Sequence, residues 1–366
     1  MKHSLPSLLT VGAALLLGSL PTPARAATMI LHNFTGDVGD GANPYGSLTL
    51  SNSKLYGLTS SGGSSSTGGA LFSMNPDGTG FGLLHSFTEG TSDGFVPFGS
   101  LTLSGARLYG TTNGGGSSGS GTVFGINTDG SGFGLLHSFT GSVGDGIHPV
   151  GSLTLSGSKL YGMAQQRFPA NRGSLFSLNT DGTDYSVLHT FTVSPVDGRN
   201  PSGSLTLSGS ILYGMTPSGG SSGVGTLFSI NTDGSGFGLL HSFGGGTSDG
   251  ANPFGSLTLS GSTLYGMTRD GGNSDNGTLF SIGTDGSNFR LLERFGGSLP
   301  GGGDPHGDLT LSDDGSLLYG MTYTGGTAGS GVVFSRPIVP EPGTFALLGP
   351  GALLLAARRR KSRPRL

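Results

Sequence analysis

The 366-residue chain contains no cysteine and no tryptophan. The lack of cysteine excludes disulfide bonds and thiolate metal sites, so the fold has to be stabilised by its core. Helical signals are also missing, because the repeated segments of the chain show no 3.6-residue apolar period and no helix-start motif. We therefore expect a fold without helices that is held together by packing.

Basic residues are scarce in the body of the chain. Between residues 28 and 338 there are 10 lysines and arginines against 20 aspartates and glutamates, a net charge of −10. The whole chain carries only −3, because most of the other basic residues lie between 358 and 365. An acidic body argues against nucleic acid as a partner, since such binding needs a basic face. Enzyme motifs are missing as well: there is no nucleophile elbow and no H-E-x-x-H sequence.

Glycine, by contrast, is abundant, and its 74 residues recur at fixed places. The segment GSLTLSGSKLYGM at residues 151–163 has close copies that begin at residues 46, 99, 203, 255 and 307. Its tyrosine recurs every 52 to 54 residues along the chain. Such regular placing of glycine indicates turns and close packing rather than disorder.

Each repeat divides into four short runs of β character. In the fourth repeat these are SLTL, ILYGM, GTLFSIN and FGLLHSF, and the last two are joined by TDGSG. Asp-Gly between two alternating runs is a strong hairpin signal. Four antiparallel strands in one repeat, six times over, predict an all-β fold: a six-bladed β-propeller with one four-stranded blade per repeat of about 52 residues.

Alternation along the strands predicts how neighbouring blades pack. Leu153, Leu160 and Gly162 are expected to face one neighbour, and Tyr161 and Met163 the other. Glycine weakens a strand, so the glycine after each tyrosine is expected where the backbone passes close beneath a neighbouring ring.

The two ends of the array are permuted. The sequence ILHNF at residues 30–34 matches a fourth run, yet it precedes any first run, and the sixth repeat stops after its third run, GVVFS, at residues 331–335. We therefore expect a ring closed by the N-terminal strand, which would supply the missing outer strand of the sixth blade.

The repeat blocks LYG, GTLFSINTDG and LLHSF resemble the GloVer tandem repeat of secreted bacterial proteins, a choice-of-anchor family. The resemblance covers about 300 residues, and the propeller domain is expected over residues 27–336. It implies display at the cell surface and assigns no activity to any residue.

Residues 1–26 are predicted to be a signal peptide. A basic start at Lys2, an apolar run and the A-x-A pattern of Ala24 and Ala26 fit a secretory leader. A retained membrane anchor is the alternative.

Residues 337–366 resemble the PEP-CTERM sorting tail of Gram-negative bacteria, with Pro340, Glu341 and Pro342, a short uncharged segment and an arginine-rich end. The segment is about 15 residues, or roughly 22 Å of helix, which is short for a membrane span. The resemblance implies an exosortase-type enzyme as partner, transient membrane anchoring, and a final place in the cell envelope, on the outer surface or in the extracellular matrix. An ordinary C-terminal anchor is the alternative.

An aspartate recurs in the long connection between repeats. We expect these carboxylates to form an acidic ring on the face of the long loops, where it could hold a cation such as calcium or a donor-rich sugar, although turn formation also explains them. The set is Asp40, Asp93, Asp145, Asp197, Asp249 and, before a proline, Asp304. A histidine in five of the six fourth runs is expected to serve packing, and Glu293 replaces it in the remaining run; the set is His32, His85, His137, His189 and His241.

The third repeat differs from the others in one loop. Its AQQRFPANRG segment brings Gln166, Arg167, Phe168 and Arg172, and Arg199 follows in the next connection. Amides, an aromatic ring and arginines suit a carbohydrate-like ligand, although random drift of a loop would also produce them. We expect a surface- or matrix-associated binding or structural scaffold, with extracellular polysaccharide as its candidate ligand. A carbohydrate-active hydrolase or lyase is the alternative, and a purely structural filler is a third possibility.

Overall fold

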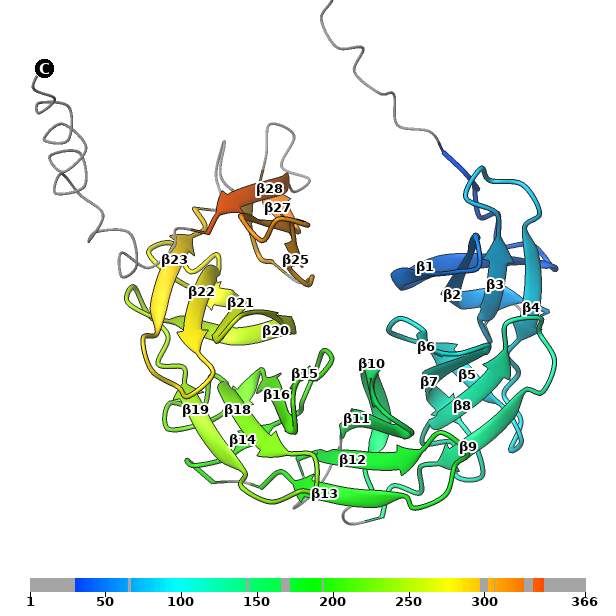
Figure 1. Ribbon diagram of the computed structural model, residues 1–366, viewed down its shortest axis with the longest axis horizontal. Helices are drawn as coiled ribbons and strands as arrows, with labels where there is room; N and C mark the ends of the chain where they lie inside the picture. Colours follow the sequence, from blue (N-terminus) through cyan, green and yellow to red (C-terminus); the bar gives the residue numbers. More distant parts are fainter. Residues whose placement is uncertain are drawn as a thin grey trace, which may run out of the picture.

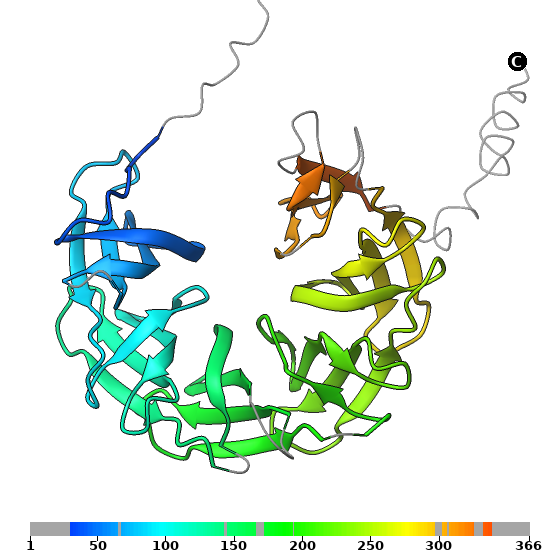
Figure 2. The same ribbon diagram turned by 180° about the vertical axis from the view of Figure 1, so that it is seen from behind.

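The computed structural model describes residues 30–64, 67–142, 145–165, 172–192, 194–296, 302–305, 307–325 and 332–338. None of these residues is helical. They form successive antiparallel sheets that follow one another around an open arc, with the first sheet at one end and the last sheet at the other (Figures 1 and 2). The expectation of an all-β, propeller-like fold is confirmed.

The first three repeats each form one sheet, with the strands in chain order. The first sheet contains β1 (Asp40–Ser51), β2 (Lys54–Gly63), β3 (Ala70–Met74) and β4 (Gly82–Ser86). The second contains β5 (Gly94–Pro97) and β6 (Thr102–Ser104), which both pair with β7 (Arg107–Gly115), then β8 (Thr122–Asn127) and β9 (Gly134–Ser138). The third contains β10 (Ile147–Ser156), β11 (Lys159–Gln165), β12 (Ser174–Asn179) and β13 (Ser186–Thr190).

The last three repeats continue the pattern. The fourth sheet contains β15 (Thr206–Ser208), β16 (Ile211–Thr216), β18 (Thr226–Asn231) and β19 (Gly238–Ser242), beside a small pair of β14 (Gly198–Arg199) and β17 (Ser218–Gly219). The fifth contains β20 (Gly250–Ser260), β21 (Thr263–Gly271), β22 (Thr278–Gly283) and β23 (Arg290–Arg294). The sixth contains β25 (Thr310–Leu311), β26 (Leu317–Thr322) and β28 (Val332–Pro337), beside a small pair of β24 (Gly302–Gly303) and β27 (Thr324–Gly325).

The Asp-Gly turns close the outer hairpins as predicted. In the second sheet, Oδ1 of Asp129 accepts hydrogen bonds from the backbone N–H and the hydroxyl of Ser131, at 2.9 and 2.6 Å. Gly130 takes a φ of 87°, which a side chain would disfavour. These aspartates therefore have a local structural role in the turn between the third and fourth strands.

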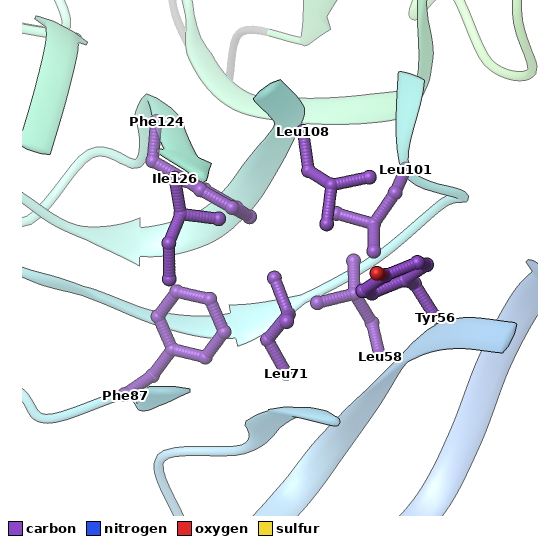
Figure 3. Close-up of a cluster of buried hydrophobic side chains, with 8 residues drawn as sticks. All are labelled: Tyr56, Leu58, Leu71, Phe87, Leu101, Leu108, Phe124 and Ile126. Carbon is purple, nitrogen blue, oxygen red and sulfur yellow. The ribbon is translucent and has the colours of Figure 1, made fainter. Parts of the chain in front are cut away.

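Side chains from neighbouring sheets interlock to make the core. Between the first and second sheets, Tyr56, Leu58 and Leu71 pack against Leu101 and Leu108 together with other buried side chains (Figure 3). The core is therefore a series of such clusters, one at each contact between sheets, rather than a single centre.

The predicted facing of the third repeat is confirmed. Leu153 and Leu160 lie in the cluster shared with the second sheet, whereas Tyr161 and Met163 lie in the cluster shared with the fourth. Alternation along two strands thus decides which neighbour each side chain meets.

The glycine after each tyrosine lies under an aromatic ring, as predicted. Gly162 in β11 is opposite Phe176 in β12, and a methyl group at Gly162 would overlap that ring. The relation recurs in all six sheets, with the pairs Gly57–Phe72, Gly110–Phe124, Gly162–Phe176, Gly214–Phe228, Gly266–Phe280 and Gly320–Phe334.

The repeated GSLTL segment forms a seam between first strands. The backbone N–H of Ser47 donates to the hydroxyl of Ser100 in the next sheet at 2.7 Å, and the hydroxyl of Thr49 donates to the carbonyl of Leu101 at 2.7 Å. Equivalent pairs of bonds join each later sheet to the next. The repeated words of the sequence therefore encode contacts between sheets as well as strands within them.

The expected closure of the ring is not present in the structure. Residues 30–34 pack on the first sheet without forming a strand, and β28 pairs with β26 alone among the described residues. The reason is that each sheet is positioned only by its neighbours, so the repeat specifies every contact but not the rotation summed around the arc.

Candidate functional site

A histidine and an aspartate eight residues apart meet at the connections that follow β4, β9, β13 and β19, and again after residues 30–34. Nε2 of the histidine lies 2.8 to 3.1 Å from a carboxylate oxygen. An ionised carboxylate can only accept, so the histidine donates. The pairs are His32–Asp40, His85–Asp93, His137–Asp145, His189–Asp197 and His241–Asp249.

Each carboxylate also holds the backbone of its own connection. In the His85–Asp93 pair, which lies between the first and second sheets, Oδ2 of Asp93 accepts hydrogen bonds from the backbone N–H and the hydroxyl of Thr88, at 3.0 and 3.1 Å. Its Oδ1 accepts from the N–H of Gly94 at 2.8 Å. The carboxylate therefore ties the end of one outer strand to the beginning of the next sheet.

The histidine is packed between aromatic rings. His85 stacks on Phe133 of the next sheet, with ring centroids 3.7 Å apart and an interplanar angle of 12°, and meets Phe87 edge-on at 4.8 Å. The predicted packing role of these histidines is confirmed. The hydrogen bond to the aspartate is an additional role, and it makes the histidine part of the contact between sheets.

These contacts lower the pKa of the aspartates. Burial disfavours the charged form of Asp145, but hydrogen bonds from His137 and Thr140 outweigh it and lower the pKa to about 2. Asp40 behaves alike: burial is outweighed by bonds from Thr35, His32 and the next backbone N–H, and its pKa is about 2. In Asp93 and Asp197, too, burial raises the pKa and the hydrogen bonds lower it, and the net result is a lowered pKa. The four carboxylates are therefore ionised at neutral pH.

The hydrogen bonds hold each carboxylate within its own connection. Both oxygens of Asp93 already accept hydrogen bonds, and its side chain is buried. Across the part of the chain that the structure describes, no group of three or more histidine and acidic side chains comes together to hold a metal ion. Cation or sugar binding by this set stays a prediction.

The assignment of Asp304 to this set is wrong. Gly302 pairs with Gly325 as Gly250 pairs with Gly271, so the register aligns Asp304 with Asn252 and not with Asp249. Both residues precede a proline and have a positive φ, 56° and 51°. The prediction grouped Asp304 with the other aspartates by residue type alone. The segment before Asp304 differs in sequence from the other connections, so the sequence did not show the correct alignment.

The connection between the fifth and sixth sheets has lost both members of the pair, because Glu293 and Gly301 stand at the two positions. Glu293 takes the position of the histidine, opposite Leu279, where His241 lies opposite Leu227. Glu293 instead accepts a hydrogen bond from Arg336 of β28 at 2.7 Å. Joint loss fits a histidine and an aspartate that act as one unit. The constant eight-residue spacing was the signal in the sequence that could have revealed this unit.

The structure places the backbone segments of two predicted loop arginines side by side. The carbonyl of Arg172 accepts a 2.7 Å hydrogen bond from the N–H of Asn200, which directly follows Arg199. Nε of Arg172 is buried and has no hydrogen-bond partner among the described residues. Arg199 lies in β14, opposite Ser218 of β17. Gln166, Arg167 and Phe168, like the sorting residues Pro340, Glu341 and Pro342, lie outside the described residues.

The fold and these contacts define an all-β, propeller-like tandem-repeat protein. The model of the Gloeobacter/Verrucomicrobia repeat matches residues 21–223 and again residues 156–348. The chain therefore belongs to the Gloeobacter/Verrucomicrobia repeat family, and the expected resemblance to GloVer-type proteins is confirmed. No curated protein matches the sequence.

Solved structures of similar fold are distant in sequence. An oligogalacturonate lyase in complex with manganese is 13% identical with a TM-score of 0.55, covering 83% of this chain and 78% of the lyase. A nidogen/laminin complex is 15% identical, with a TM-score of 0.44 and coverages of 69% and 79%. TolB from Acinetobacter baumannii is 12% identical, with a TM-score of 0.43 and coverages of 74% and 57%. Within the described residues, no helix has the length and apolar character needed to cross a membrane.

Proposed function

We propose that this chain is an exported repeat scaffold, displayed in the cell envelope, on the outer surface or in the extracellular matrix of a Gram-negative bacterium. Residues 1–26 would direct export. The tail with Pro340, Glu341 and Pro342 would anchor the chain transiently and present it to an exosortase-type enzyme. Membership of the repeat family and the leader and tail patterns of the sequence support this proposal.

The scaffold we propose is a six-bladed propeller whose ring is closed by residues 30–34. The support is a match of numbers: five sheets carry an outer strand, the sixth lacks one among the described residues, and one outer-strand sequence stands before the first sheet. Closure would give the display unit a rigid shape and would pair the open edge of β28, which leaves only the short edges of complete blades.

The ligand we propose is extracellular polysaccharide, bound where the third and fourth sheets meet. One observation carries this proposal: the N–H of Asn200 donates to the carbonyl of Arg172, so Arg172 and Arg199, which directly precedes Asn200, lie on neighbouring segments there. The acidic groups of bacterial polysaccharides suit guanidinium donors.

The test is retention of polysaccharide from the producing organism by the full chain. Arg172→Ala and Arg199→Ala should each weaken retention about tenfold, the effect of losing roughly 1.4 kcal/mol. Lys159→Ala is the matched control. It also removes one positive charge from the third sheet, but Lys159 begins β11, whereas the loop that leads to Arg172 follows the other end of that strand. Equal retention by all three variants would contradict the proposed site.

The same incubation separates binding from catalysis. Calcium or manganese is added to parallel samples, and newly formed reducing or unsaturated sugar ends are measured. Retention without new ends supports a binding scaffold. Release of ends would instead support the alternative, a carbohydrate-active hydrolase or lyase, and would direct attention to the aspartates of the connections.

A further inference from the structure

Five contacts between successive sheets share one set of interactions. The glycine that begins each GSLTL or GDLTL segment is the first member: a Cβ at Gly46 would collide with the carbonyl of Gly99, and the same holds from Gly99 to Gly151 and onward as far as Gly307. The serine and threonine bonds of the seam and a buried apolar cluster complete the set. Each contact therefore has two distinct halves, one on either sheet.

The first sheet exposes the half that receives a preceding sheet. Leu48 is 52% exposed, whereas its counterparts in the other five sheets are 4 to 6% exposed. Leu50 is 62% exposed as well. In the second sheet, the hydroxyl of Ser100 accepts a hydrogen bond from the first sheet. Its counterpart in the first sheet, Ser47, is exposed. Ser47 and Leu48 line a hollow of about 360 Å³ on this face, together with residues of the segment 30–34.

The sixth sheet exposes the complementary half. Tyr319 is 40% exposed against 2 to 7% for its five counterparts, and Val333 is 77% exposed against 0%. Asp308 and Thr310, the counterparts of Ser47 and Thr49, are exposed, and Gly307 has no backbone neighbour at its Cβ position. A hollow of about 450 Å³ runs along β28, and every residue of that strand lines it.

Residues 30–34 already occupy the place of an outer strand before the first sheet. His32 stacks on Phe81 with centroids 3.7 Å apart and an interplanar angle of 8°, which repeats the geometry of His85 on Phe133. Phe34 meets Phe72 edge-on at 5.3 Å. The segment therefore lies where the outer strand of a sheet preceding the first one would lie.

We propose that the exposed face of the sixth sheet binds the exposed face of the first sheet of the same chain, as a sixth copy of the contact. In register with β3 and β4, His32 would lie opposite Val333 and Asn33 opposite Val332. The N–H of Asp308 would donate to the hydroxyl of Ser47, and the hydroxyl of Thr310 to the carbonyl of Leu48. This inference rests on the closed scaffold proposed above and identifies its contact residues.

The chain has no cysteine, so an engineered pair reports this contact alone. The test pair is Ser47→Cys with Asp308→Cys, introduced into the full chain. The control pair is Ser100→Cys with Ser152→Cys, because the N–H of Ser100 lies 2.8 Å from the hydroxyl of Ser152 in the same seam. After mild oxidation, non-reducing gel mobility and the mass of the linked peptides identify the bond.

We expect the test pair to form a bond within one chain, to an extent within about twofold of the control pair. Bonds between chains that increase with protein concentration would overturn the proposal and assign the two faces to contacts between copies. No bond, while the control pair is linked, would also overturn it. Polysaccharide retention depends on Arg172 and Arg199, so failure of closure and failure of ligand binding give separate results.

Discussion

Nε2 of His137 lies 2.8 Å from Oδ1 of Asp145, although the two residues are separated by a whole connection between sheets. The imidazole also stacks on Tyr185 of the next sheet, with ring centroids 3.6 Å apart. One side chain thus links an outer strand, the connection that follows it and the neighbouring sheet. Because four of the five contacts between the described sheets carry this arrangement, it is a major part of what fixes those sheets to one another.

Asp197→Asn should destabilise the fold by about 1–3 kcal/mol, because charge-assisted hydrogen bonds from His189 and Thr192 to a buried carboxylate are lost. The measurement is the free energy of unfolding from a urea titration. Asp233→Asn is the control in an exposed turn and should change stability by less than about 0.5 kcal/mol. Equal effects of both substitutions would show that the His–Asp pair has no special role.

His189→Gln and Asp197→Asn should be non-additive when combined. Once one partner is gone, removal of the other costs less, so the double variant should be less destabilised than the sum of the two single variants by about 0.5–3 kcal/mol. The unfolding free energies of the four proteins in this cycle measure the coupling. A strictly additive result would mean that the two side chains stabilise the connection independently.

Acid should weaken the protein between about pH 4 and pH 2. The folded pKa of Asp40 and of Asp145 is about 2, below the ordinary value. A depressed carboxylate pKa stabilises the fold above the unfolded pKa of about 3.9, and this stabilisation is lost as the pH falls through the folded value. Thermal melts from pH 6 to pH 2 test this. The Asp145→Asn variant should lose less stability over that window than the parent protein, and an identical loss would contradict the assignment.

Gly214→Ala should destabilise the fourth sheet by about 1–3 kcal/mol, because the added methyl overlaps the ring of Phe228. Gly238→Ala is the control in the same sheet, since nothing lies within 4 Å of the Cβ position there. Melting temperatures of the two variants make the comparison. If Gly214→Ala melted no lower than Gly238→Ala, the close packing of ring on backbone would be unimportant for stability.

Loss of the aromatic face of residues 30–34 should lower the melting temperature. His32 stacks on Phe81 and Phe34 meets Phe72 edge-on, so a His32→Ala, Phe34→Ala double variant removes the contacts that hold this segment on the first sheet. We expect a loss of about 2 kcal/mol or more. Asn33→Ala alters an exposed side chain of the same segment and should have little effect. Similar melting of both variants would contradict a structural role for the segment.

Much of the fold could be predicted because the repeat carries it. The alternation around Tyr161 and the glycine after it led to the correct neighbours for Leu160 and Met163 and to the ring above Gly162. These predictions rest on local rules, which hold within a strand whatever its surroundings. The arc itself could not be predicted, since small rotations at each contact add up over six sheets.

The contacts of the candidate site were harder to predict. The sequence placed His85 and Asp93 in separate sets, one for packing and one for binding, because nothing local shows that an outer strand and the following connection fold back on each other. Asp304 was grouped by its residue type, whereas the register of β24 aligns it with Asn252. The constant proline after both residues is the better guide in that segment.

The most direct test of the six-sheet scaffold is hydrogen exchange of the backbone amides of β28 in the full chain. In the fifth sheet, β22 is paired on both edges, by β21 and β23, and serves as the internal reference. If residues 30–34 complete the sixth sheet, the amides on the outer edge of β28 should be protected as strongly as those of β22, and the His32→Ala, Phe34→Ala variant should lose this protection. Rapid exchange along the outer edge of β28 in the parent protein would contradict the closed scaffold.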